Sequence, residues 1–280
     1  NFNFKRPYGI PVRYHDFQKL TSNSPLDFVE FHLSYQDLNE KPSDFIMDKP
    51  QLFFTVHAPE LFKNDHILDL CSIDENYRKL SVNYLNEVIE HCDEISRCFR
   101  DQDSPILVVN AGGWDTAGFV PDEKKGIYYE NLKKSLNEIN STKVKIAFQT
   151  MPPFPWHFGG QSFHNLFVNP YEIDTFCSET GQKICFDVSH SMMACNYYGW
   201  DLNDFIDIVS KHIVYLHVVD AKGSDGEGVQ LGEGDVNFKD LATILNKTCP
   251  NAPFIPEVWQ GHKDGGSGFW SALEYLENYL

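Results

Sequence analysis

Four polar residues, each near the end of an apolar run, are the strongest candidates for a chemical site in this 280-residue sequence. They are Gln149, Asp187, His217 and Glu257. One imidazole, two carboxylates and an amide oxygen make an oxygen-rich ligand set, which suits Mn²⁺, Mg²⁺ or Co²⁺ and also permits Zn²⁺. Buried groups of this kind are costly unless they are paired or bind a cation. We therefore predict that these four residues share one divalent metal ion.

Eight short apolar runs, each ending in polar residues, would position these side chains. The runs cover residues 9–15, 28–34, 52–59, 105–113, 143–152, 183–191, 212–221 and 253–262. Helical periodicity lies between them, most clearly in residues 72–99, 201–211, 237–248 and 269–280. Eight alternating strand and helix units in about 250 residues are typical of a closed (β/α)₈ barrel. An open doubly wound sheet is the alternative, but the first run is not followed by its glycine-rich loop.

Large apolar residues alternate with small or polar ones within the runs, which supports a sheet closed into a barrel. Residues two apart in a strand share a face, so each run would have one large apolar face and one smaller or polar face. In the sixth run, Cys185 and Asp187 alternate with Ile184 and Phe186. Large apolar residues would face the helices, whereas smaller or polar residues would fill the barrel. The filling would become hydrophilic toward the C-terminal mouth, where such barrels hold their catalytic groups. We predict an α/β fold, a single-domain (β/α)₈ TIM barrel.

The start of the chain bears on its domain organisation. It begins Asn1-Phe2-Asn3-Phe4, without an initiator Met or a signal-peptide pattern. We interpret residues 8–280 as the barrel and residues 1–7 as an N-terminal extension or linker. The same observation leads us to expect a barrel that is fused to, or associated with, another domain.

Composition restricts the partners. Lys and Arg number 23 and Asp and Glu number 40, so the formal charge is −17. A surface this acidic repels nucleic-acid phosphates and anionic lipids, and no apolar run approaches the roughly 20 residues of a membrane span. The seven cysteines include no CxxC pair, which favours buried, reduced thiols in a cytoplasmic protein. We expect a small-molecule partner, and neither nucleic acid nor membrane.

Several motifs resemble those of the xylose-isomerase-like barrels, a superfamily of sugar-phosphate isomerases, epimerases, dehydratases and endonuclease IV. Ile184-Cys-Phe-Asp187-Val-Ser-His190 resembles its Asp-x-x-His strand, and Val214-Tyr-Leu-His217 with Gly232-Glu-Gly234 resembles its seventh strand and Gly-x-Gly loop. Phe254-Ile-Pro-Glu257, Val56-His57-Ala-Pro59 and Leu26-Asp-Phe-Val-Glu30 are similar to its eighth, third and second strands. The likeness runs from residue 8 through nearly the whole chain.

The resemblance implies roles for individual residues. Asp187, His217 and Glu257 would be metal ligands, with the fourth ligand from the fifth strand. His190 would contact substrate hydroxyls, and His57 would line the pocket. The implied activity is isomerisation or epimerisation of a carbohydrate with a divalent metal.

Two positions depart from the family pattern. The fifth strand has Gln149 where the family has an acid. A glutamine can offer a metal its oxygen but cannot accept a proton at neutral pH, so two-base epimerisation is in doubt and Glu257 remains the base. Asn110 stands where endonuclease IV-like chains have a histidine ligand. That change and the negative charge both disfavour a DNA-repair enzyme.

Further residues are expected to contact a substrate at the mouth. Strand-end candidates are Arg13, Glu30, His57 and Asn110, and Trp259 lies two residues after Glu257 on the inward face. Trp156 and His157 belong to a long aromatic loop, residues 151–168, that is a candidate lid over a sugar. Lys222 and Arg13 are candidates for holding a substrate anion, although lone basic residues are usually solvated. The glycine-rich residues 223–234 lack the GxxxxGK[ST] pattern, and we interpret them as a flexible loop.

Three hypotheses follow. The first is a metal-dependent sugar or sugar-phosphate isomerase or epimerase that moves a proton next to a carbonyl, with Glu257 and His190 as catalytic residues. The second is a non-catalytic or regulatory sugar-binding module of a larger polypeptide, which Gln149 favours. The third, an endonuclease IV-like enzyme, is disfavoured by the charge.

Overall fold

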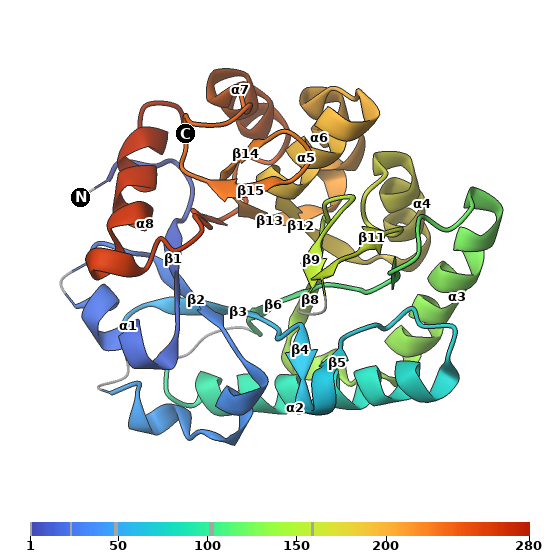
Figure 1. Ribbon diagram of the computed structural model, residues 1–280. Coiled ribbons are helices and arrows are strands. Elements are labelled where there is room, and N and C mark those ends of the chain that lie inside the picture. The colour runs from blue at the N-terminus through green and yellow to red at the C-terminus, as the bar shows by residue number, and fades with distance from the viewer. Residues whose placement is uncertain (1, 23, 48–49, 101–103, 158–159) are drawn as a thin grey trace.

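The eight parallel strands expected from the apolar runs are present and form one sheet (Figure 1). The computed structural model describes residues 2–22, 24–47, 50–100, 104–157 and 160–280. In spatial order, the strands are β1 (Gly9–Val12), β2 (Phe28–His32), β3 (Phe53–His57), β6 (Ile106–Val109), β8 (Lys145–Gln149), β12 (Lys183–Asp187), β13 (Ile213–His217) and β16 (Phe254–Ile255). Because spatial order follows chain order, each strand neighbours the next one along the sequence.

The two edges of this sheet meet through a short contact. Tyr8, just before β1, forms an isolated parallel bridge with Phe254 of β16. The Phe254 amide also donates a hydrogen bond to the Pro7 carbonyl, at 3.1 Å. The sheet is therefore a nearly closed barrel, and the predicted single-domain TIM barrel is confirmed.

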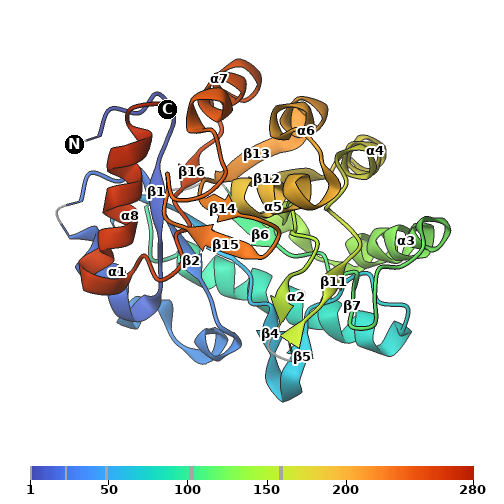
Figure 2. The same ribbon diagram turned by 45° about the horizontal axis from the view of Figure 1, so that its top comes forward.

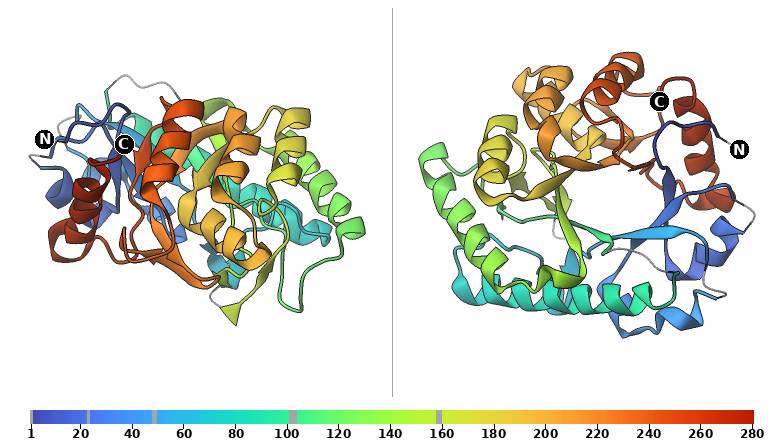
Figure 3. Two further views of the ribbon diagram at one scale, coloured as in Figure 1. Left: turned by 90° about the horizontal axis from the view of Figure 1, so that it is seen from above. Right: turned by 180° about the vertical axis from the view of Figure 1, so that it is seen from behind.

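In the described part of the chain, eight α-helices surround the barrel (Figures 1 and 3). They are α1 (Tyr14–Thr21), α2 (Glu75–Ser96), α3 (Asp122–Glu138), α4 (Pro170–Thr180), α5 (Val188–Tyr198), α6 (Leu202–Val209), α7 (Phe238–Thr248) and α8 (Lys263–Leu276). The four helical stretches predicted from periodicity correspond to α2, α6, α7 and α8. The stretch predicted as 201–211 is shorter as an α-helix, because α6 is followed by a 3₁₀ turn, Ser210–His212.

Two apolar layers lie on the two sides of the strands, as the alternation predicts. The barrel interior holds a small cluster with one residue from each of six strands: Phe28, Val108, Ala147, Cys185, Tyr215 and Ile255. The larger cluster packs between strands and helices and includes Ile184 and Phe186. The inward-facing positions closer to the C-terminal ends of the strands lie outside this apolar cluster, so polar side chains can occupy them at the mouth.

Among the described residues, four short pairs of antiparallel strands lie in the loops outside the barrel sheet, three of them labelled in Figure 2. They are β4 (Leu61–Phe62) with β5 (His66–Ile67), β7 (Trp114–Asp115) with β11 (Phe163–His164), β9 (Trp156–His157) with β10 (Gly160–Gln161), and β14 (Asp220–Lys222) with β15 (Gly226–Val229). The β7–β11 pair joins the loop after β6 to the loop after β8. These two loops therefore form one structure at the mouth.

Residues 2–7 pack against the C-terminal part of the barrel, and they lie near α8 (Figures 1 and 2). The Arg6 guanidinium donates to the carbonyls of Cys249 and Ala252, at 3.1 and 3.3 Å. Six of the seven cysteines are buried. Within the described part of the chain, no helix is long and apolar enough to cross a membrane.

The start of α4 provides a test of local stability. Asn169 caps this helix, because its Oδ1 accepts from the Tyr171 amide at 2.9 Å and the Glu172 amide at 3.4 Å. We expect Asn169→Ala to lower the free energy of unfolding by about 1 kcal/mol, since both amides lose this partner. Asn169→Asp keeps the acceptor and is the matched control. Equal losses in urea denaturation of the two variants would contradict a capping role.

Candidate metal centre and substrate cavity

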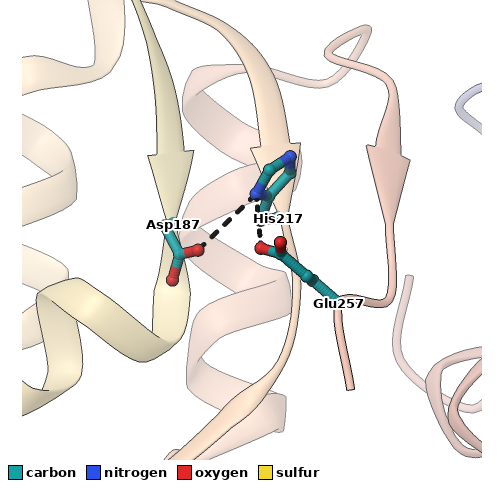
Figure 4. A group of neighbouring side chains, drawn as sticks. All are labelled: Asp187, His217 and Glu257. Carbon is teal, nitrogen blue, oxygen red and sulfur yellow. Dashed lines mark ion pairs between the residues drawn. The ribbon is translucent and has the colours of Figure 1, made fainter. Parts of the chain in front are cut away.

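The side chains of Asp187, His217 and Glu257 point toward one another at the mouth of the barrel (Figure 4). His217 Nδ1 lies 2.7 Å from Glu257 Oε2 and 3.6 Å from Asp187 Oδ2. One ligand atom from each residue lies within 4.8 Å of the others. The amide of Gln149 joins them, because its Nε2 is 2.9 Å from Asp187 Oδ2 and 3.0 Å from His217 Nδ1. The structure thus brings together all four residues proposed from the sequence as ligands, which we call the four-residue cluster.

The sheet explains why residues so far apart in sequence meet. Asp187 and His217 are paired residues at the ends of the neighbouring strands β12 and β13. Gln149 ends β8 on the other side of β12, and Glu257 follows the end of β16 beside β13. Parallel strands in a barrel end at one mouth, so their inward-facing end residues converge.

Asp187 also begins a helix. It is the N-cap of α5, where its Oδ1 accepts from the His190 amide at 2.8 Å. The Asp-x-x-His spacing therefore has a structural cause, because the third residue after the cap supplies that amide. Capping fixes one carboxylate oxygen and leaves Oδ2 toward Gln149 and His217.

His217 lies between carboxylates on both sides of its ring. Its Nε2 is 3.1 Å from Glu30 Oε1, and Glu30 is fully buried beneath it. Burial alone would lower the pKa of His217, but the charges of Glu257 and Glu30 raise it well above its ordinary value. Burial would likewise raise the pKa of Glu30, but His217 and His32 hold it well below its usual range. Glu30 therefore orients the ring of His217, as carboxylates do for metal-binding histidines.

Glu257 differs from Asp187, the other acid of the cluster, in its access to solvent. Its side chain is 27% exposed, whereas that of Asp187 is 1% exposed. Burial would raise the pKa of Glu257, but the charge of His217 and its hydrogen bond, with His32 and His57 nearby, lower that pKa below its usual range. Glu257 is therefore an ionised carboxylate that a molecule in the cavity can reach.

The donor set fits a divalent cation. Three carboxylates, from Glu30, Asp187 and Glu257, surround one imidazole, so a cation would balance their charge. The fourth position depends on His57, whose Nδ1 lies 2.9 Å from the Ala58 carbonyl and must donate to it. A neutral ring can then only accept at Nε2, whose neighbour in the structure is Gln149 Oε1 at 2.9 Å. Since rotation of an amide exchanges its two ends, Gln149 can donate to His57 and turn its oxygen to the cluster.

A cavity of about 600 Å³ opens beside the cluster. Asp187 and Glu257 reach its wall, as do the predicted substrate residues Arg13, Trp156, Trp259 and His190. The two indoles are 75% and 74% exposed, which is unusual for tryptophan. They come from loops after β8 and β16, and both present apolar faces to whatever enters the cavity.

His190 is held on both ring nitrogens. Nδ1 lies 2.8 Å from the Thr150 carbonyl, and Nε2 lies 2.9 Å from Glu227 Oε1. Burial alone would lower the pKa of His190, but Asp187 and Glu227 raise it to about 10. His190 is therefore a cation in the cavity wall, paired with a half-exposed carboxylate that sequence reasoning missed.

The glycine-rich segment that supplies Glu227 differs from the flexible loop expected. It contains the β14–β15 hairpin, and Asp220 at its base accepts from the amides of Gly232, Gly234 and Val236. These hydrogen bonds order the segment. No local pattern in the sequence indicated this order. Lys222 lies in the hairpin with an exposed side chain and is not part of the cavity wall.

Three other predicted substrate residues lie away from the main cavity. Glu30 is fully buried under His217, and His57 binds the Gln149 amide. Asn110, just after β6, donates from Nδ2 to Glu60. Glu60 is a second acid that sequence reasoning missed; burial raises its pKa, against the effect of His57.

Comparison with known proteins was consistent with this architecture. The family described as "Xylose isomerase-like TIM barrel" matches residues 19–279. An uncharacterized protein of Methanocaldococcus jannaschii is 24% identical over 72% of this chain, which spans 63% of that relative's length. A probable endonuclease 4 of Mycoplasma mycoides is 23% identical over 76% of this chain and 69% of its own length.

Solved structures share the fold along almost the whole chain. A D-tagatose 3-epimerase-like protein is 21% identical with a TM-score of 0.69, covering 98% of both chains. Endonuclease IV from Thermus thermophilus is 16% identical with a TM-score of 0.62, covering 97% of this chain and 99% of its own. At these identities, the structural likeness supports the fold alone. The match to the family over residues 19–279 shows that the chain belongs to the xylose isomerase-like TIM barrel family.

Proposed function

We propose that this protein is a divalent-metal-dependent enzyme that isomerises or epimerises a small carbohydrate by moving a proton on a carbon next to a carbonyl. The observation that carries the proposal is the four-residue cluster, with Glu257 reachable from a large cavity. Solved relatives in this fold include proteins described as D-tagatose 3-epimerase-like and D-allulose 3-epimerase, which supports the substrate class.

The proposed roles follow from position. Gln149, Asp187, His217 and Glu257 would hold the cation, which when bound supplies charge stabilisation at the carbonyl oxygen. Glu257 is the proposed base, because it is the exposed, ionised carboxylate of the cluster. His190 would donate to a substrate hydroxyl, and Trp156 and Trp259 would pack on the sugar from two sides of the cavity.

Gln149 restricts the mechanism to one base. A two-base epimerase needs a carboxylate on each face of the substrate carbon, and an amide cannot take a proton at neutral pH. Glu257 would therefore remove and return the proton from one side. This chemistry suits isomerisation between neighbouring carbons more directly than inversion at one carbon.

Solvent deuterium tests the proposal. The protein, loaded with Mn²⁺, is incubated in D₂O with a panel of ketoses and aldoses, with and without phosphate, and NMR follows deuterium at carbons next to the carbonyl. Metal-dependent incorporation into at least one sugar is the expected result. Binding of a sugar without incorporation would instead favour the non-catalytic module, which Gln149 makes the second candidate. Cleavage of abasic DNA without sugar exchange would favour the activity named for the endonuclease relatives.

Restoring the acid at the fifth strand gives a directional prediction. We expect Gln149→Glu to tighten Mn²⁺ binding, because a carboxylate replaces a neutral amide beside the cation. It should also raise inversion at the reacting carbon relative to isomerisation, since a second proton acceptor then faces the site. Calorimetry with Mn²⁺ and NMR product ratios measure both effects. Gln149→Asn, which keeps the amide but shortens it, is the control and should do neither.

A further inference from the structure

A second, very small cavity lies beside the ends of β3, β6 and β8. Its polar lining comes from Glu60, Asn110, Trp114, His157 and His164. Its volume is about 10 Å³, which is room for a single water-sized group. Gly112 forms part of the wall with φ +95°, and a Cβ there would collide with Asp69. The turn after β6 therefore depends on glycine to bring Asn110 and Trp114 to the same cavity.

Three polar atoms in this wall have no hydrogen-bond partner. They are Asn110 Oδ1, Trp114 Nε1 and His157 Nδ1. Across the described residues, six buried side-chain polar atoms lack a partner, and half of them belong to residues that line this one cavity. Asn110 and His157 are only 7% and 5% exposed. Buried polar atoms in folded proteins are nearly always satisfied, so these three indicate a polar occupant.

The types of these atoms identify the occupant's chemistry. Trp114 Nε1 can only donate, so it needs an acceptor, whereas Asn110 Oδ1 can only accept, so it needs a donor. A hydroxyl group or water offers both. A phosphate accepts without donating and would lie beside the Glu60 carboxylate, and a metal ion would face the Trp114 N–H. The cavity is therefore built for one neutral hydroxyl-like group.

The cavity is close to the candidate metal centre. Glu60 lies three residues after His57, whose Nε2 is 2.9 Å from Gln149 of the cluster, and Met151 of the cavity wall lies two residues after Gln149. The Asn110 amide nitrogen donates to the Glu60 carboxylate. Arg13 and Trp259 border the main cavity beside the ends of β1 and β16, whereas this cavity borders β3, β6 and β8. The two cavities therefore lie beside different strand ends of one mouth, and a linear sugar that reacts at the cluster would place one end toward each.

The charges around both cavities also disfavour a phosphate. Arg13 is the one Lys or Arg in the wall of the main cavity as described, against five carboxylates there. They belong to Asp16, Asp187, Asp225, Glu227 and Glu257. The small cavity has no Lys or Arg in its described wall. Glu227 is paired with His190, and Asp187 and Glu257 would hold the cation, so Asp16 and Asp225 remain beside Arg13. Neither cavity, in its described lining, therefore offers a dianion an unpaired Lys or Arg cluster.

We infer that the small cavity receives one hydroxyl group of the substrate, and that the substrate is a neutral sugar with no phosphate. This inference rests on the proposed function and names its substrate class. A substrate lacking the hydroxyl at that end would leave Asn110 and Trp114 unsatisfied, and a phosphate there would be excluded.

Sugars altered at their ends test the inference. The Mn²⁺-loaded protein is assayed for deuterium incorporation with D-tagatose and D-allulose, their 1- and 6-deoxy forms, and their 1- and 6-phosphates. We expect loss of the hydroxyl at one end, and not at the other, to lower kcat/KM roughly 10- to 100-fold, because buried polar atoms lose their partner. Phosphorylated sugars should give no measurable incorporation.

Variants connect that selectivity to the cavity. His157→Phe keeps an aromatic ring beside Trp114, whose ring centroid is 5.3 Å from that of His157, but removes the ring nitrogen. It should weaken reaction of the parent sugar and have little further effect on the deoxy sugar. His15→Phe, at an exposed site outside both cavities, is the matched control and should preserve the selectivity. Calorimetry of the parent and deoxy sugars with Glu257→Gln compares their binding affinities without turnover.

The outcomes separate the two proposals. Equal activity on phosphorylated and neutral sugars would overturn the inference and leave the proposed function intact. Equal kcat/KM for the parent and both deoxy sugars would show that the cavity holds only water, which also overturns it. Absence of incorporation into every sugar, phosphorylated or not, would reject the proposed function and the inference with it.

Discussion

Glu257→Gln is expected to lower deuterium incorporation into the substrate by about 10²- to 10⁴-fold, the usual contribution of a general base. The side chain keeps its length and an oxygen that can face a cation, but it can no longer accept a proton. Its carboxylate is the exposed acid of the four-residue cluster, 2.7 Å from His217 Nδ1. Incorporation measured by NMR with the most reactive sugar of the panel checks the prediction.

Two controls separate loss of the base from other damage. Glu233→Gln makes the same change at an exposed position in the loop after β15 and should leave incorporation unchanged. Metal content of Glu257→Gln, measured after loading with Mn²⁺, shows whether the cluster still binds the ion. If the variant exchanges deuterium at the normal rate, Glu257 is not the base and the one-base mechanism is wrong.

The barrel was predictable because its signals are local and repeated. Cys185 and Asp187 alternate with Ile184 and Phe186, and the structure places the first pair inward and the second toward the helices. Inward end residues of parallel strands must converge at one mouth, so Gln149, Asp187 and His217 could be grouped from their positions alone. The cap at Asn169 was likewise readable, since it depends on neighbours within three residues.

The parts that were not predictable depend on the directions of loops. Glu227 contacts His190 because Asp220 accepts hydrogen bonds from the distant amides of Gly234 and Val236, which order the hairpin. No short sequence pattern predicts these hydrogen bonds. Glu60 lies three residues beyond His57, after a proline, and its contact with Asn110 depends on how two loops fold together. Strand periodicity ends where these segments begin.

The sequence also did not predict how deeply each inward-facing side chain is buried in the barrel. Glu30 and His32 share a face, so alternation predicts that both point inward. It does not reveal that Glu30 is covered by His217 while His32 reaches the cavity wall. The stagger of neighbouring strands decides which inward residue is the last one before solvent, and stagger is a property of the whole barrel.

Asp187→Asn is expected to weaken Mn²⁺ binding at least about 100-fold, while the fold remains intact. The two oxygens of Asp187 have different tasks: Oδ1 caps α5 through the His190 amide, and Oδ2 faces His217. Asparagine is an equally good helix cap, so this change preserves the cap and removes the charge that the cation requires.

Asp201→Asn is the matched control, because Asp201 caps α6 in the same way but lies at an exposed site outside the cluster. Calorimetry of chelator-treated protein with Mn²⁺ should give normal affinity for Asp201→Asn and a large loss for Asp187→Asn. Equal Mn²⁺ affinities would mean that the convergence of these side chains is an ion-pair network around His217, and that the protein's chemistry does not depend on a metal at this site.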